Sequence, residues 1–271
     1  MRTDFPIYKL LEAQKECRLT PRKNRLIAVH LARLMPVMDP LEWFDPSRDP
    51  ATVRLGTLLA EEERDCIAGA HRFANGRMDR EYLSWLHARQ VSLTHHYGSS
   101  WRRAILPDRL EQVNMVLRHA ASGVAEVVVG HQAPAAALAA MHRTSEYSRL
   151  TWIYARNLNL GNPLVGRWTR FHKLVRQARV SADLLANDVV TDIALPGFAL
   201  AGRPRFHPTV VEMAEGAAAV DHAPDEVAVL ADAIEEYLEA GTLRDAAMRA
   251  CRSGGVHYEG FWVTDLIRGM A

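Results

Sequence analysis

The clearest pattern of hydrophobic and polar positions lies near the C-terminus. Apolar residues recur there at steps of three and four, with acidic residues between them: Val227, Leu230, Ala231, Ile234, Tyr237 and Leu238 against Asp232, Glu235, Glu236 and Glu239. This spacing gathers the apolar side chains on one side of an α-helix. Because glycine readily adopts the left-handed conformation that ends many helices, we expect Gly241 to close this one. A short helix over about 244–251 and a last apolar segment over 262–267 follow.

Helical periodicity extends over most of the chain. Thr20 followed by Pro21 predicts one helix start, because threonine caps free N–H groups and proline lacks only an N–H that has no partner there. Asp79 and Pro134 predict two more starts, and Tyr82 is expected to face inward. The expected helices cover about 7–18, 21–38, 40–44, 58–74, 80–97, 107–125, 134–141 and 164–179.

Together these elements predict an all-α fold. We expect a multi-helix globular bundle that forms a single domain over residues 1–271. Glycine and proline are dense between Asp192 and Pro208, which predicts an irregular connector before the C-terminal helices. This connector permits a division into a helical body, 1–194, and a C-terminal helical segment, 208–271.

Composition indicates a nearly neutral net charge and the cellular compartment in which we expect the protein. The 33 Lys and Arg against 32 Asp and Glu leave a net charge of +1, which favours neither nucleic acid nor an acidic partner for the molecule as a whole. Three scattered cysteines without a CxxC pair favour a reducing compartment. The N-terminus does not resemble a signal peptide, and no run of eighteen apolar residues is present. We therefore expect a cytoplasmic protein without a membrane span.

The local charge is uneven. The sequence around 164–179 predicts an amphipathic helix with one apolar side, formed by Leu164, Trp168, Phe171, Leu174, Val175 and Ala178. Its polar side is basic, with these cations: Arg167, Arg170, Lys173, Arg176 and Arg179. Such a face binds phosphates or an acidic surface. The alternative is an internal pairing, because residues 221–239 carry seven acids and no Lys or Arg.

Catalytic motifs are weak throughout the chain. There is no HExxH and no GxSxG, and the adjacent His95 and His96 point about 100° apart on a helix. We therefore predict no metal and no cofactor, and a metal-dependent hydrolase is only the third hypothesis. Whether the protein is an enzyme is left open.

The C-terminal segment resembles the closing segment of a large paralogous family of uncharacterised proteins from planctomycete-type bacteria. The resemblance rests on LADAIEEYLEAG and ACRSGGVHYEGFWVTDLIRGM, with these matching residues: Cys251, Arg252, Gly255, His257, Trp262, Val263, Asp265 and Leu266. Relatives often carry cysteines where this chain has Ala28, His30 and Phe261, which argues against a thiol site here. The resemblance implies a fold and an extent, and no activity.

Four residues of this segment form a second candidate site. Arg252, His257, Trp262 and Asp265 offer a guanidinium, an imidazole, an aromatic face and a carboxylate, which suit a small anion or a peptide terminus. In the alternative interpretation Trp262 is core, Asp265 pairs with Arg252 or caps a helix, and His257 bonds a buried carbonyl.

The sequence therefore favours a non-enzymatic protein-interaction or accessory module. A protein partner is expected, and a homo-oligomer is compatible with the alanine-rich helices. A nucleic-acid- or phosphate-binding protein that uses the basic helix 167–179 is the alternative.

Overall fold

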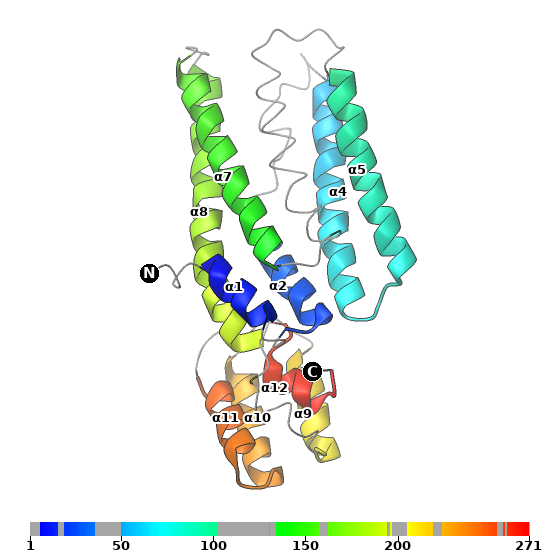
Figure 1. Cartoon of the computed structure of the whole chain (residues 1–271), viewed down its shortest axis with the longest axis vertical. Helices are drawn as coiled ribbons and strands as arrows, with labels where there is room; N and C mark the ends of the chain where they lie inside the picture. Colours follow the sequence, from blue (N-terminus) through cyan, green and yellow to red (C-terminus); the bar gives the residue numbers. More distant parts are fainter. Residues whose placement is uncertain are drawn as a thin grey trace. The chain divides into compact units, whose positions relative to one another are not determined.

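The computed structural model describes residues 6–15, 19–35, 50–101, 130, 134–157, 162–193, 196, 205–218, 224–253, 257 and 259–270. Within these ranges it contains ten α-helices and no strand (Figure 1). This confirms the predicted all-α, multi-helix fold. Among the helical residues whose side chains are not described are 93–101, 150–157 and 162–168. The predicted helices near 40–44 and 107–125 lie outside the described residues.

The chain forms two compact units. The first, here the N/C unit, combines residues 1–27 with 186–271, and the second, the central unit, comprises residues 28–185. The division falls within two helices, α2 (Pro21–Arg33) and α8 (Asn162–Ile193). The predicted single domain, with its division at the connector, stays a prediction.

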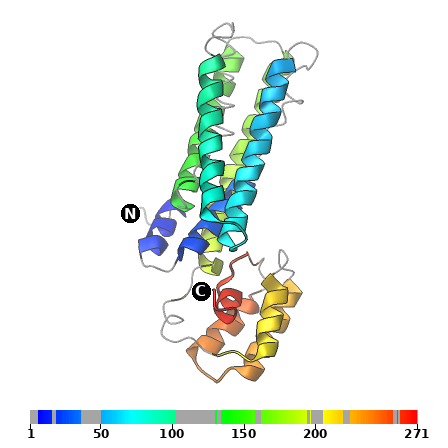
Figure 2. The ribbon, with the colours of Figure 1, turned by 90° about the vertical axis from the view of Figure 1, so that its right-hand side faces the viewer.

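In the N/C unit the helices after the connector surround one apolar core. This unit contains α1 (Pro6–Lys15), α9 (Pro208–Ala218), α10 (Pro224–Tyr237), α11 (Thr242–Cys251) and α12 (Trp262–Ile267). Helix α10 packs against α9 and α11, and α12 contacts both of these (Figure 2). The predicted stripe of α10 supplies Val227, Leu230 and Ile234 to this core, each at most 1% exposed. The periodicity of the sequence thus located the buried side of α10 as far as Ile234, whereas Tyr237, also predicted in the stripe, is 42% exposed.

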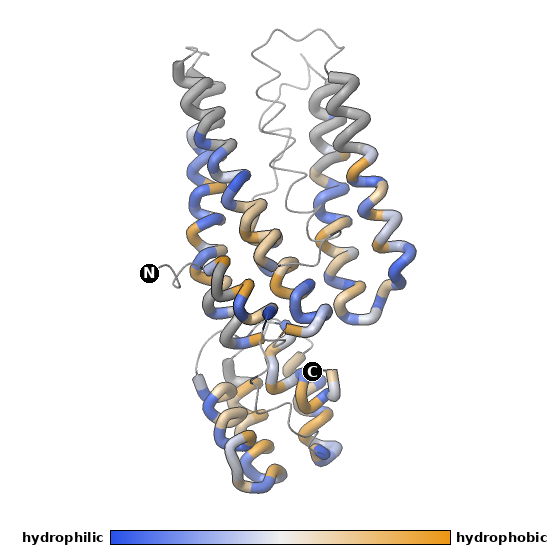
Figure 3. Tube along the Cα trace, viewed as in Figure 1, coloured by the Kyte–Doolittle hydropathy of each residue, from blue (hydrophilic) through white to orange (hydrophobic). Residues whose placement is uncertain are grey.

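The central unit contains two helical pairs. Helices α4 (Pro50–Ala74) and α5 (Arg80–Trp101) pack together through a turn in which Gly76 has φ 68°. A Cβ atom at Gly69 of α4 would clash with the Leu86 side chain of α5, which would then have to shift. Helix α7 (Pro134–Asn157) lies beside α8; within their described parts, α7 begins with an apolar stretch and then becomes hydrophilic, whereas hydrophobic and hydrophilic positions alternate along α8 (Figure 3).

Side-chain caps begin two of the helices as predicted. The Lys23 N–H donates to Thr20 Oγ1 at 3.3 Å, and the Tyr82 N–H donates to Asp79 Oδ1 at 2.7 Å. Each bond satisfies an amide that has no partner within its helix. Short-range capping signals were therefore sufficient to place these starts.

Several predicted boundaries are wrong. Helix α4 begins at Pro50 and not at Leu58, so Glu62 and Glu63 lie within the helix and are buried. Helix α5 continues through the expected break at Gly98 to Trp101. A glycine costs a helix only about 1 kcal/mol, which packing against a neighbouring helix can offset.

Helix α7 and Gly241 also differ from expectation. Helix α7 continues past Met141 to Asn157, and the Thr144 hydroxyl donates to the Ala140 carbonyl at 3.0 Å, which satisfies a buried polar group along the helix. Gly241 has φ 165°, which is extended backbone, and it precedes α11 without closing α10 in a left-handed turn. Tyr82 is 45% exposed and does not face inward.

The expectation about membranes can be checked for the described helices. None of them combines the length and the apolar character needed to cross a membrane.

Candidate functional site

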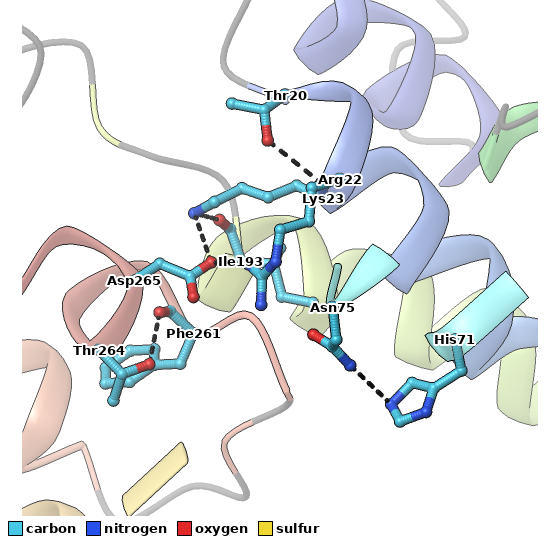
Figure 4. Close-up of polar contacts among 9 residues, drawn as sticks. All are labelled: Thr20, Arg22, Lys23, His71, Asn75, Ile193, Phe261, Thr264 and Asp265. Atoms are coloured by element: carbon cyan, nitrogen blue, oxygen red, sulfur yellow. Dashed lines mark hydrogen bonds and ion pairs between the residues drawn. The ribbon is translucent and has the colours of Figure 1, made fainter. Parts of the chain in front are cut away.

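A buried polar cluster joins the two ends of the chain within the N/C unit. We call it the C-terminal clasp, and it consists of Arg22, Lys23, Asp192, His257 and Asp265. The Asp265 carboxylate pairs through Oδ2 with the Arg22 guanidinium and lies 3.8 Å from Lys23 Nζ (Figure 4). Asp265 and Lys23 are both 0% exposed. These contacts connect the first turn of α2 to α12.

Lys23 also forms a hydrogen bond to the C-terminal end of α8. Its ammonium donates to the carbonyl oxygen of Ile193, the last residue of α8, at 2.6 Å. A cation is favourable there because the carbonyls at a helix C-terminus carry partial negative charge. Burial lowers the pKa of Lys23 to about 8, although Asp265 and Asp192 act in the opposite direction. The ammonium is therefore held by its carboxylate partners against a cost of desolvation.

His257 lies in the same cluster and contacts a different carboxylate. Its Nδ1 lies 2.7 Å from Asp192 Oδ1, and its ring is tilted against Phe261 with centroids 4.3 Å apart. Among the described residues, His257 Nε2 and Asp265 Oδ1 have no hydrogen-bond partner. The two cations and two carboxylates of the clasp cancel in formal charge when His257 is neutral.

The clasp has the residue types of a catalytic or binding site, but a ligand in solvent has little access to it. An aspartate that orients an imidazole through Nδ1 is an arrangement also used for general bases, whose Nε2 must reach a substrate. His257 is only 4% exposed, and Trp262 is 4% exposed within the apolar core. This geometry favours the alternative in which the segment stabilises the fold.

Only two of the four candidate residues of the C-terminal segment, His257 and Asp265, belong to the clasp. Arg252 is at the surface, where its Nη2 donates to Asp232 at 2.8 Å and to Glu235 at 2.7 Å. The expected pair of Asp265 with Arg252 is therefore wrong, as is the expected bond of His257 to a carbonyl. The structure instead connects Arg252 to α10, and Asp265 to α2.

The basic helix is a solvent-facing part of α8 in the central unit. Phe171 and Val175 are buried on one side, whereas Arg170, Lys173 and Arg176 are exposed on the other. None of these three cations forms an ion pair with another described residue. Arg179 lies 3.9 Å from Asp183 on the same helix, and the side chain of Arg167 is outside the described residues.

The exposed side of α8 is also apolar, and the predicted grouping of Leu174 with the buried side chains of Phe171 and Val175 is wrong. Three aliphatic residues lie among its cations: Leu174 at 42% exposure, Val180 at 49% and Leu184 at 63%. We define the basic α8 face as these three residues together with Arg170, Lys173 and Arg176. Nearby His172 has a lowered pKa, first because of burial and then because of Arg176 and of Arg149 on α7. Positive charge thus continues from α8 towards α7.

Comparisons with known proteins were made for the whole chain. No protein-family model, curated protein or solved structure matches it. The candidate sites therefore rest on their own geometry.

An aromatic cluster is exposed on α5. The rings of Tyr82 and Trp85 lie 5.3 Å apart, and the guanidinium of Arg89 lies 5.2 Å from the Trp85 ring. Arg89 also pairs with buried Glu62 of α4 at 2.7 Å. Trp, Tyr and Arg are frequent at the centres of protein interfaces. Sequence reasoning missed this cluster because helical periodicity had placed Tyr82 in the core.

Metal and thiol chemistry have little support in the described part of the chain. No group of three or more His, Cys, Asp or Glu side chains there is arranged to hold a metal ion. Cys66 and Cys251 are free and buried, and burial raises the pKa of each thiol to about 12. A reactive thiolate needs the opposite environment. The side chains of His95 and His96 lie outside the described residues.

The clasp partners of α2 and α8 were also missed by sequence reasoning. Arg22 and Lys23 occupy the first turn of α2, where the helix dipole disfavours cations. Two cations directly after a cap and a proline were therefore a signal that a carboxylate lies nearby. The sequence could not identify Asp265, which is 243 residues from Arg22.

Proposed function

We propose that this protein is a non-enzymatic interaction module that binds an acidic, amphipathic segment of a partner protein on the basic α8 face. The observation that carries the proposal is the combination of three cations and three exposed aliphatic side chains on one side of one helix. We also propose, from the sequence, a cytoplasmic location and membership of the family that the C-terminal segment resembles.

The aliphatic residues bear on the class of partner. Covering Leu174, Val180 and Leu184 removes apolar surface from water, which stabilises a complex by roughly 25 cal/mol for each Å² buried. A phosphate backbone has no apolar surface to offer them. An amphipathic helix with acidic and aliphatic positions satisfies both the cations and these side chains.

The cations set the orientation of the partner in the complex and increase the rate at which the complex forms. Charge pairs at the rim of an interface are worth about 0–1 kcal/mol each, yet they guide association and select the partner. The six residues of the basic α8 face include three cations and no carboxylate, and Asp183, which precedes Leu184, already contacts His142 Nε2 at 2.7 Å and lies 3.9 Å from Arg179. The three cations therefore repel another basic surface and attract an acidic one. This charge pattern supports an acidic partner and gives the complex a measurable dependence on salt.

A nucleic-acid- or phosphate-binding function is the second candidate. It is supported by the same three cations and by Arg149, which extends the positive charge towards α7. The net charge of +1 and the exposed aliphatic residues give it less support.

The test compares two probes on the full chain. One probe is a synthetic helical peptide of glutamate and leucine with an amphipathic pattern, and the other is a single-stranded RNA or DNA of about 20 nucleotides. A peptide with the same composition in scrambled order controls for charge alone. Binding is measured by fluorescence anisotropy at about 50 mM and about 500 mM salt.

Two double variants separate the candidates. R170E/R176E reverses charge, L174S/L184S removes apolar surface, and R72E/R80E is a charge-matched control at exposed positions of α4 and α5. An interaction module binds the amphipathic peptide at least about tenfold more tightly than the scrambled one, and both α8 variants weaken it. If oligonucleotide binding depends on R170E/R176E but not on L174S/L184S, the second candidate is correct. Absence of peptide binding, or equal loss in the control, refutes the proposal.

A further inference from the structure

A second surface of the same chain has the opposite charge. The solvent side of α10 and the chain just after it carry five exposed residues, which we call the acidic α10 face: Val229, Asp232, Glu235 and Glu236 on the helix, and Glu239 two residues beyond its end at Tyr237. Val229 is 52% exposed, and the side chain of Asp232 is 74% exposed. From residue 221 to 239 the sequence contains no lysine or arginine. This face therefore has the acidic and aliphatic character that suits the basic α8 face.

Part of this acidity is already neutralised, and part is not. Arg252 pairs with Asp232 and Glu235, whereas Glu236 and Glu239 form no ion pair with any described residue. The basic α8 face likewise retains three cations without an ion pair among the described residues. The excess charges on the two faces are opposite in sign and similar in number, in a chain whose total charge is only +1.

We infer that the acidic partner of the basic α8 face is a second copy of this chain, which presents its acidic α10 face. The inference rests on the proposed function, because it names the partner for the same face. Each copy has one face of each kind, so the α8 face of one copy meets the α10 face of another. Aliphatic contacts hold the complex, and the charge pairs fix its orientation.

The test measures self-association of the full chain by analytical ultracentrifugation over a concentration series. R170E/R176E makes both faces acidic, and E236K/E239K makes both faces basic. Each variant alone is expected to lose association by at least about tenfold in Kd, because like charges then face one another. An equimolar mixture is expected to regain it, because an acidic α8 face in one variant meets a basic α10 face in the other. Circular dichroism verifies that both variants are folded, and R72E/R80E is again the control.

The outcomes distinguish this inference from the proposed function. A chain that is monomeric at every concentration, or a mixture that fails to associate, overturns the inference. If the monomeric chain still binds the amphipathic peptide through α8, the proposed function stands with a different partner. Self-association that neither variant alters also overturns the inference, because it then uses another surface.

Discussion

Replacing Asp265 with asparagine is the most direct test of the C-terminal clasp. The substitution keeps the size of the side chain and removes its charge. Asp265 is 0% exposed and pairs with Arg22, and Lys23 Nζ lies 3.8 Å away. Asp265→Asn therefore leaves the fully buried Lys23 ammonium without its nearest carboxylate.

The structure sets the size of the effect. Removing one partner of a buried ion pair typically costs about 3–5 kcal/mol, because an uncompensated charge stays in the interior. Lys23 already has a pKa of about 8 instead of 10.5. At roughly 1.4 kcal/mol per pH unit, this difference corresponds to about 3 kcal/mol by which folding disfavours the ammonium even with Asp265 present. We expect Asp265→Asn to lower the free energy of unfolding by about 3–5 kcal/mol near pH 6.

The effect has a defined pH dependence. Because the folded-state pKa of Lys23 lies below its unfolded value, the penalty is complete below about pH 8. It is relieved as the pH rises from about 8 to 10.5, so this group makes stability increase with pH in that window. Without Asp265, which raises the pKa of Lys23, the window begins at lower pH. The cost of Asp265→Asn should therefore be smaller near pH 9 than near pH 6.

The assay is urea denaturation followed by circular dichroism across this pH range. Wild type, Asp265→Asn, Lys23→Met and the double variant form a cycle that isolates the interaction between the two side chains. We expect Asp265→Asn to cost much less in the Lys23→Met background, because no ammonium is then stranded. A cost below about 1 kcal/mol, or an equal cost in both backgrounds, would show that Asp265 does not compensate Lys23.

Three further predictions concern other buried groups. Burial raises the pKa of Glu63 to about 8 from 4.5, so the contribution of Glu63 to stability is complete below pH 4.5 and is lost as the pH rises through 8. Glu63→Gln should therefore flatten this decline, as measured by the midpoint of urea denaturation at each pH. Glu61→Gln, at an exposed position, should leave the decline unchanged. Gly260 has φ 90°, and a Cβ there would lie 2.8 Å from Leu26 Cδ1, so Gly260→Ala should cost about 1–3 kcal/mol in urea denaturation. Gly241→Ala is the matched control, since its backbone is extended and no atom lies within 4 Å of the added Cβ; equal effects would contradict the argument. Cys66 and Cys251 should react slowly with iodoacetamide near pH 8 in the folded protein and rapidly in urea, as measured by peptide mass spectrometry, because burial raises both pKa values to about 12.

Local sequence signals are sufficient to locate several elements of the fold. The apolar stripe of α10 up to Ile234, the Thr20 cap, the Asp79 cap and the start of α7 at Pro134 are as predicted. These features depend on residues within about one helical turn of one another, where capping and periodicity act. The predicted ends of α5 and α7 were wrong; a glycine such as Gly98 costs a helix only about 1 kcal/mol and does not by itself end α5.

The candidate sites depended more strongly on the tertiary structure. The sequence alone determined the all-α class, the basic character of α8 and the acidic character of α10, because composition and spacing are sufficient for these properties. Only the fold decided that Asp265 pairs with Arg22, that Arg252 pairs with α10, and that Leu174 and Leu184 face solvent beside the cations. The reason is that ion pairing and burial depend on distances between residues far apart in the chain, and no local pattern encodes those distances.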